Sequence, residues 1–93
     1  MISRYDVDVY PERGYVYFRL DPHGRYIDAR ISFEVLEMLF GPFTDPKGCL
    51  LVDSHAARIE EVTRAKAARY LARGHPFDGG VLELVAENFG LSP

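Results

Sequence analysis

An alternation of apolar and polar residues between positions 6 and 31 is the feature that most constrains what this chain can fold into. Successive side chains of a strand point to opposite faces, so a period of two predicts strands that are buried on one face only. We expect three such strands, at residues 6–10, 15–20 and 25–31. Their apolar face would consist of Val7, Val9, Val16, Phe18, Leu20, Ile27, Ala29 and Ile31.

Proline and glycine separate the three expected strands. Residues 11–14 (PERG) and 21–24 (DPHG) are typical of tight turns, and the second has the residue preferences of a type I turn. Short turns join antiparallel neighbours, so we expect a three-stranded meander. One face of such a meander must be covered by apolar groups, and the following helices would supply them.

A short helix is expected directly after the third strand. Ser32 is a good N-cap for a helix over residues 33–40, because its hydroxyl can accept from a free backbone N–H of the first turn. Gly41-Pro42 would end this helix. Residues 43–48 are interpreted as a loop.

A long helix is expected from about residue 50 to residue 73, since this stretch is rich in Ala, Leu, Glu and Arg and lacks Gly and Pro. Its start is left open, because Asp45-Pro46 could also cap a helix that begins earlier. At about 100° per residue, one stripe of this helix would pack on the sheet. The stripe consists of Val52, Ala56, Ile59, Thr63, Ala67 and Tyr70.

The chain is expected to return to the sheet after the long helix. Residues 81–85 follow a glycine-rich loop and predict a fourth strand, with residues 86–90 as a closing turn. Residues 1–93 would then form a single α+β domain of the order βββααβ, with both helices packed on one face of the sheet. A chain of 93 residues has a thin core, so a contact between copies would stabilise it and we expect a homodimer.

Composition favours a cytoplasmic protein. The single cysteine, Cys49, cannot form an internal disulfide, and no export signal is recognised near the start. The longest apolar run, from Cys49 to Val52, is far shorter than the roughly 20 residues that cross a bilayer. A net charge of −3 gives no general attraction to phosphate backbones. We therefore expect neither a membrane nor a nucleic acid as the partner.

No pattern of catalytic or metal-binding residues is recognised. Asp53-Ser54-His55 contains the residue types of a hydrolytic triad, but neighbours on a helix diverge by about 100°, so a helix start is the better interpretation. Glu60 and Arg64 are interpreted as a solvated pair. The spacings of a metal site are missing among His23, His55, His75 and Cys49. We expect no enzyme, no metal and no cofactor; an enzyme with an unrecognised pocket is kept as an alternative.

The polar face of the meander is a possible partner face, because tyrosine and arginine are enriched at protein interfaces. It consists of Tyr15, Tyr17, Arg19, Tyr26 and Arg30, alongside Tyr10, Asp6, Asp8 and Asp28. Two alternatives stay open. In the first, the tyrosines are simply good strand formers on a half-wet sheet; in the second, the chain's own C-terminal segment covers them.

A basic arc of the long helix is a possible anion-binding face and supports nucleic-acid binding as an alternative function. It consists of Arg58, Lys66, Arg69 and Arg73. The other interpretation is that these long side chains cover the rim of the core with their stems.

Several segments of the chain are similar to those of a known bacterial family. They are YVYFRL (15–20), ARISFEVLEMLFG (29–41), ARIEEVTRAK (57–66) and DGGVLEL (78–84), followed by Asn88-Phe89. In these segments the chain resembles the family catalogued as domain of unknown function 1488. The resemblance implies an α+β fold with strands before and after a helical pair, and it assigns no functional residue. We therefore expect a non-catalytic interaction or regulatory module that self-associates through its tyrosine-bearing face or an open sheet edge.

Overall fold

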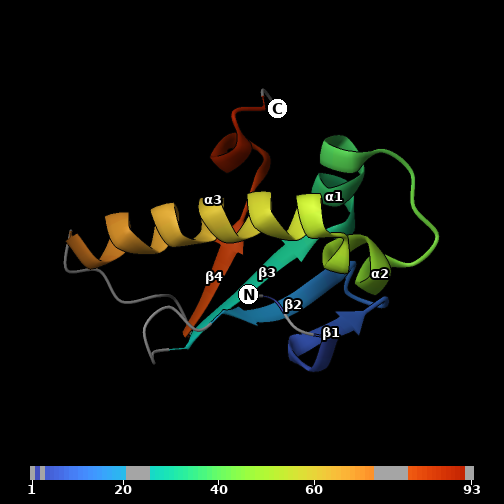
Figure 1. The fold of residues 1–93 in the computed structure, drawn as a ribbon, viewed down its shortest axis with the longest axis horizontal. Coiled ribbons are helices and arrows are strands. Elements are labelled where there is room, and N and C mark those ends of the chain that lie inside the picture. Colours follow the sequence, from blue (N-terminus) through green and yellow to red (C-terminus); the bar gives the residue numbers. More distant parts are fainter. Residues whose placement is uncertain (1, 3, 21–25, 73–79, 92–93) are drawn as a thin grey trace.

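Four strands and their connecting helices make up the described part of the chain, residues 2, 4–20, 26–72 and 80–91 of the computed structural model. Figure 1 shows the longest helix lying across one face of the sheet. The strands are β1 (Val7–Tyr10), β2 (Tyr15–Leu20), β3 (Ile27–Ser32) and β4 (Val81–Leu84). The helices are α1 (Phe33–Phe40), α2 (Pro46–Leu51) and α3 (Asp53–Ala72), with short 3-10 helices η1 (Arg4–Asp6) and η3 (Ala86–Phe89).

The sheet has the strand order β1-β2-β3-β4 and contains both kinds of strand pairing. β1, β2 and β3 are antiparallel neighbours, which confirms the predicted meander. β4 pairs with β3 in parallel, with Ala29 opposite Leu82 and Ile31 opposite Leu84. A parallel neighbour requires a long crossover, which the helices between β3 and β4 provide. The α+β fold class and the order of strands, helices and final strand are confirmed.

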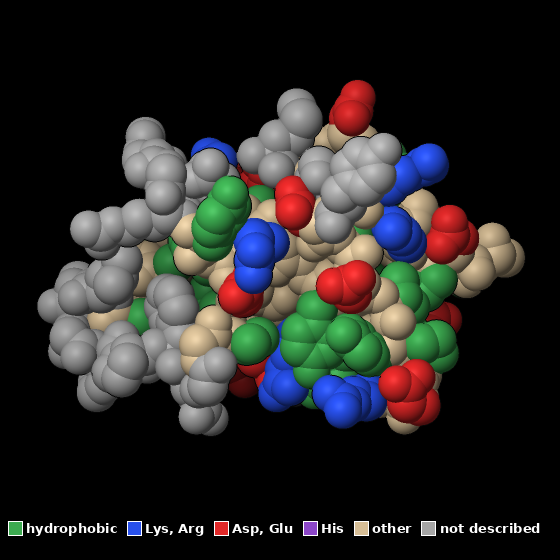
Figure 2. All heavy atoms as spheres, turned by 90° about the horizontal axis from the view of Figure 1, so that it is seen from below, with side chains coloured by type: hydrophobic (Ala, Val, Ile, Leu, Met, Phe, Trp, Pro, Cys, Tyr) green, Lys and Arg blue, Asp and Glu red, His purple; other side chains and the backbone are tan. Residues whose placement is uncertain are grey.

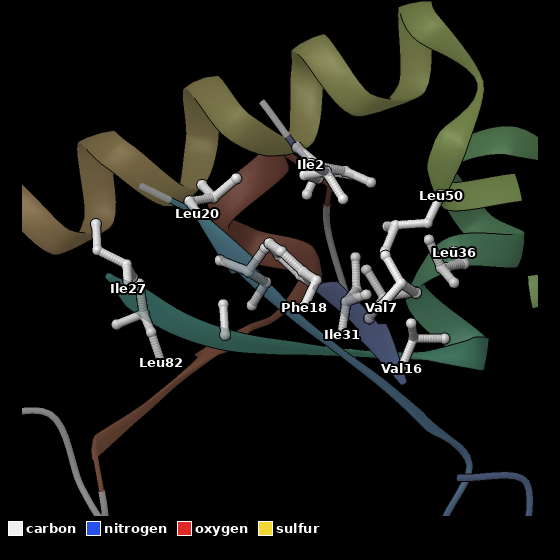
Figure 3. Packing of buried hydrophobic residues seen from close by; sticks show 14 of the residues in the cluster. Ile2, Val7, Val16, Phe18, Leu20, Ile27, Ile31, Leu36, Leu50 and Leu82 are labelled. Atoms are coloured by element: carbon white, nitrogen blue, oxygen red, sulfur yellow. The ribbon is translucent and has the colours of Figure 1, made fainter. Parts of the chain in front are cut away.

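The apolar face predicted from the alternation forms the core. Val16, Phe18 and Leu20 of β2 are buried, and the register places them opposite Ile31, Ala29 and Ile27 of β3. Apart from Ala29, which belongs to the same cluster, these side chains are labelled in Figure 3, where they converge beneath α3 with Leu36 of α1 and Leu50 of α2. Ile2 also lies in this cluster, although no sequence pattern predicted it there.

Helix α1 has the predicted bounds and the predicted cap. Ser32 Oγ accepts a hydrogen bond from the backbone N–H of Val35 at 3.1 Å, which satisfies one free donor of the first turn. Gly41 ends the helix with φ 82°, a conformation that glycine adopts without a steric penalty. Val35 and Leu36 face the core.

The long helix expected from about residue 50 is present as α3, but it begins at Asp53, because the helix is interrupted at Val52. This residue has an extended conformation, with φ −64° and ψ 128°, between α2 and α3. Leu50 and Ile59 are both fully buried, yet residues nine apart on one continuous helix point about 180° away from each other. The break lets α2 and α3 each turn an apolar side toward the same core. Val52 is therefore 46% exposed and does not belong to the packing stripe.

The earlier helix start, left open in the sequence, is the one observed for α2. Asp45 occupies the N-cap position and Pro46 the first turn, where its missing N–H is not needed. Residues 46–48, expected in a loop, are therefore helical. Proline explains the difference, since its fixed φ favours a helix start as well as a turn.

The rest of the predicted stripe packs on the sheet. Ile59, Thr63 and Ala67 of α3 are buried, and Ala56 and Tyr70 are partly buried against the core. Thr63 Oγ1 donates to the carbonyl of Ile59 at 2.6 Å, so this hydroxyl has a partner inside the core. Small side chains at these positions let the helix approach the strands closely.

Several expected boundaries shift by one or two residues. β1 begins at Val7 because Asp6 ends η1, β4 ends at Leu84, and η3 replaces the expected closing turn. The turn at 21–24, residue 25 and residue 73 lie outside the described residues, and α3 is described as far as Ala72.

The expected Glu60–Arg64 pair is present at 3.8 Å, but Glu60 is not a solvated residue. Its side chain is 16% exposed, and its Oε1 accepts a hydrogen bond from the backbone N–H of Ile2 at 2.6 Å. The carboxylate thus holds the start of the chain against α3. Of the helices in the described ranges, none combines the length and hydropathy needed to span a membrane.

Candidate functional site

The face of the sheet turned away from the helices carries most of the side chains predicted for partner binding. Figure 2 shows the molecule from below, where a group of green side chains, a class that includes tyrosine, lies among basic and acidic ones. We call this surface the open face. Its described residues include Asp8, Tyr10, Arg13, Tyr15, Tyr17, Arg19, Tyr26, Asp28, Arg30 and Glu83.

One residue from each strand forms a row across the middle of the open face. Asp8 lies opposite Tyr17, Tyr17 opposite Arg30, and Arg30 opposite Glu83. Side chains directly opposite one another on antiparallel strands lie about 5 Å apart, which is close enough to interact. This row comes from residues that are far apart in the sequence.

Arg30 is the centre of the interactions in this row. Its Nε donates to Oε1 of Glu83 at 2.9 Å, and its Nη2 donates to the same oxygen. Its Nη1 donates to the hydroxyl of Tyr17 at 3.3 Å, and its guanidinium lies 4.7 Å from the ring centroid of Tyr15. Arg30 therefore joins β2, β3 and β4 on the solvent side.

These contacts shift two ionisation equilibria. The hydrogen bond from Arg30 lowers the pKa of the Tyr17 phenol below its ordinary value of 10.0, because the guanidinium stabilises the phenolate. The hydrogen bonds to Tyr17 and then to Glu83 raise the pKa of Arg30, so its charge is retained. The open face thus keeps a fixed positive charge at its centre.

A second arginine–carboxylate pair, Arg19 and Asp28, joins β2 and β3 on the same face. Arg19 Nε donates to Oδ1 of Asp28 at 2.7 Å, and the Arg19 guanidinium lies 5.0 Å from the ring centroid of Tyr26. The bond to Asp28 raises the pKa of Arg19. Tyr26 is 67% exposed, so its ring is available at the surface.

Tyrosine rings fill the other end of the open face. Tyr10 and Tyr17 meet edge to face with centroids 5.0 Å apart, and Tyr15 lies 6.4 Å from Tyr17. Arg13, in the turn between β1 and β2, lies 5.5 Å from the ring centroid of Tyr10. A hollow of about 370 Å³ lies between this cluster and the Arg19–Asp28 pair.

The structure brings together the five residues predicted to form the partner face, while Asp6, predicted alongside them, lies in η1 and lines the hollow. Tyr15, Tyr17 and Arg30 contact one another, while Arg19 and Tyr26 form the neighbouring pair. Sequence reasoning missed Glu83, although its position between Leu82 and Leu84 is a period-two signal. It also missed Arg13, whose place follows from the turn geometry.

The described C-terminal residues pack on α3 and do not cover the open face. Arg58 Nη2 donates to the carbonyl of Phe89 at 3.1 Å, and Lys66 Nζ donates to Asn88 Oδ1 at 2.9 Å. Burial lowers the pKa of Lys66. The predicted anion-binding face is thus partly used to hold η3. Arg69 is exposed, and Arg73 lies outside the described residues.

Side chains also form hydrogen bonds with backbone groups along the outer edge of β4. Lys66 Nζ also donates to the carbonyl of Glu83, and Asn88 Oδ1 accepts from the N–H of Val85 at 2.9 Å. An added strand needs free backbone groups, so these bonds make the β4 edge a poor place for pairing. The open face is a stronger candidate for a contact than this edge.

The structure also brings Cys49 next to His55, across the break between α2 and α3. Cys49 Sγ lies 3.7 Å from Nδ1 of His55, and the same nitrogen lies 3.0 Å from the carbonyl oxygen of Cys49. The imidazole stacks on Phe40 with centroids 3.7 Å apart, beside a hollow of about 470 Å³. Sequence spacing gave no signal for this pair, because it depends on the break at Val52.

This pair lacks the geometry of an activated nucleophile. A carbonyl oxygen can only accept, so a His55 Nδ1 that is bonded to it carries the proton and cannot take one from the thiol. Burial, and then the charge of Asp45, raise the pKa of the Cys49 thiol. A reactive cysteine needs the opposite shift. No group of three or more metal-binding side chains occurs among the described residues.

Comparison with protein-family models, with curated proteins and with solved structures finds no match for this chain. The resemblance to domain of unknown function 1488 therefore stays a prediction, and the functional argument depends on the geometry of the open face.

Proposed function

We propose that this chain is a non-catalytic cytoplasmic interaction module that self-associates through the open face of its sheet. The observation that carries the proposal is the Tyr10–Tyr15–Tyr17 cluster around Arg30, whose rings and guanidinium are already held by mutual contacts. Side chains ordered before binding lose little conformational entropy on association. Tyrosine and arginine are also the residue types that most often dominate the energy of protein contacts.

The charge pattern favours a protein surface over a nucleic acid. Arg19 and Arg30 are each bonded to a carboxylate of a neighbouring strand, Asp28 and Glu83 respectively. A phosphate backbone would have to displace these carboxylates and would also meet Asp8. A protein surface with charges of both signs can match this pattern. We expect no retention on heparin at low salt.

Sedimentation equilibrium over a wide concentration range tests the proposal. We expect the mass to rise from the 10.6 kDa monomer to twice that value as the concentration increases. Tyr10→Ala removes an edge-strand ring of the cluster and should weaken the dimer by about tenfold or more. Met38→Ala is the matched control, because Met38 is 49% exposed but lies on α1.

Circular dichroism would first verify that each variant is folded. A wild-type chain that stays monomeric at the highest concentration would contradict self-association. A dimer weakened equally by both substitutions would place the contact elsewhere.

A further inference from the structure

The open face carries one cation and one carboxylate that have no ionic partner among the described residues. Arg13 and Asp8 line the same hollow, which is also lined by Asp6, Arg19 and Asp28. Asp6 already has an interaction of its own and acts on the charge of Arg19. Arg19 and Asp28 neutralise each other at 2.7 Å, and Arg30 pairs with Glu83. Arg13 and Asp8 are therefore the charges that a partner would have to match.

These two charges lie at neighbouring levels of the open face. A level is a set of residues that lie opposite one another on adjacent strands, such as Asp8 and Tyr17. The Arg13 guanidinium lies over the Tyr10 ring, so its charge stands at the level of the Tyr10–Tyr15 pair. Asp8 stands one level further along β1 on the same face, opposite Tyr17. A symmetric dimer brings the same surface of both copies together, and a two-fold axis that crosses the strands between two levels lays each of these levels over the other.

We propose that two copies pack their open faces together about a two-fold axis that crosses the strands between these levels, so that Arg13 of each copy forms an ion pair with the partner's Asp8. This inference rests on the self-association proposed above. The axis places the Tyr10 level of one copy over the Asp8 level of the other. It also places Tyr15 over the partner's Tyr17, while Arg30 faces the neutral Ser32.

A second face-to-face arrangement is less favourable. An axis parallel to the strands, between β2 and β3, would lay β1 over the partner's β4. The register would then bring Asp8 over the partner's Glu83, and like charges across an interface repel. The axis across the strands avoids this repulsion, and by symmetry it forms the Arg13–Asp8 ion pair twice, once in each direction between the copies.

Charge reversal gives a test with an internal rescue. Asp8→Arg and Arg13→Asp should each weaken the homodimer by about tenfold or more, because each places two pairs of like charges at the interface. The double variant Asp8→Arg/Arg13→Asp should dimerise again. An equal mixture of the two single variants should form a heterodimer, detected by a fluorophore on one of them in sedimentation velocity.

Two control variants carry matched charge changes away from the open face. Glu61 and Arg69 are exposed on α3, so Glu61→Arg and Arg69→Glu should leave the dimer unchanged. A wild-type dimer that depends on Tyr10 but ignores the reversals, or one that neither the double variant nor the mixture restores, would overturn this arrangement and leave the proposed function standing. A wild-type monomer at all concentrations would overturn both.

Discussion

Arg30 Nε donates to Oε1 of Glu83 at 2.9 Å across the parallel pair of β3 and β4, and thereby fixes the guanidinium that also bonds the Tyr17 hydroxyl. Two segments separated by all three helices thus hold one side chain in place on the solvent side of the sheet. The same guanidinium controls the ionisation of the phenol.

Arg30→Gln should raise the pKa of Tyr17 toward its ordinary 10.0, because the phenolate loses the stronger of the two cations that stabilise it, Arg30 and Arg13. Ultraviolet titration of tyrosinate would measure the change, with Tyr17→Phe identifying which transition belongs to this residue. Arg19→Gln is the control, since Arg19 pairs with Asp28. A Tyr17 transition that stays in place in Arg30→Gln would contradict the assignment.

Local patterns predicted the sheet and α1, because a period of two and a capping residue each depend on neighbours in the sequence. Ser32, Gly41 and the alternation through β2 are examples. The open face followed from the same alternation, since fixing the buried parity of a strand also fixes its solvent side.

The remaining features depend on tertiary packing. The break at Val52 arises because Leu50 and Ile59 must share one core, a condition set by the sheet beneath them. The Cys49–His55 pair follows from that break. Glu83 reaches Arg30 only because β4 pairs in parallel with β3. The order of the strands along the chain does not determine which strand β4 pairs with.

Glu60→Ala should lower the free energy of unfolding by about 1–3 kcal/mol, because it leaves the N–H of Ile2 without its acceptor at the edge of the core. Urea denaturation would measure the loss. Glu61→Ala is the matched control on the exposed side of α3 and should change stability by less than about 0.5 kcal/mol. Equal effects of the two substitutions would show that Glu60 does not hold the start of the chain.

Ala67→Leu should destabilise the fold by about 1–3 kcal/mol, because Ala67 is buried where α3 packs on the sheet and a larger side chain forces the two apart. The neighbouring Ala68 is exposed, so Ala68→Leu should change stability by no more than about 0.5 kcal/mol. Thermal and urea unfolding of both variants would separate the effect of packing from that of helix propensity. If Ala67→Leu were neutral, the close approach of α3 to the strands would be wrong.

The Cys49 thiol should ionise above its ordinary pKa of 9.0, because burial and the charge of Asp45 both disfavour the thiolate. Alkylation of the folded chain would therefore be slow near neutral pH, and its rate would rise with a midpoint above 9.0. Asp45→Asn removes the charge and leaves the burial, so its midpoint should fall part of the way toward that of an unfolded control. Since the raised pKa belongs to the folded state, the unfolded thiol ionises first and stability should decrease as the pH rises through this range. A midpoint below 9.0 in the wild-type chain would mean that His55 activates the thiol, and the pair would then have to be reconsidered as a reactive site.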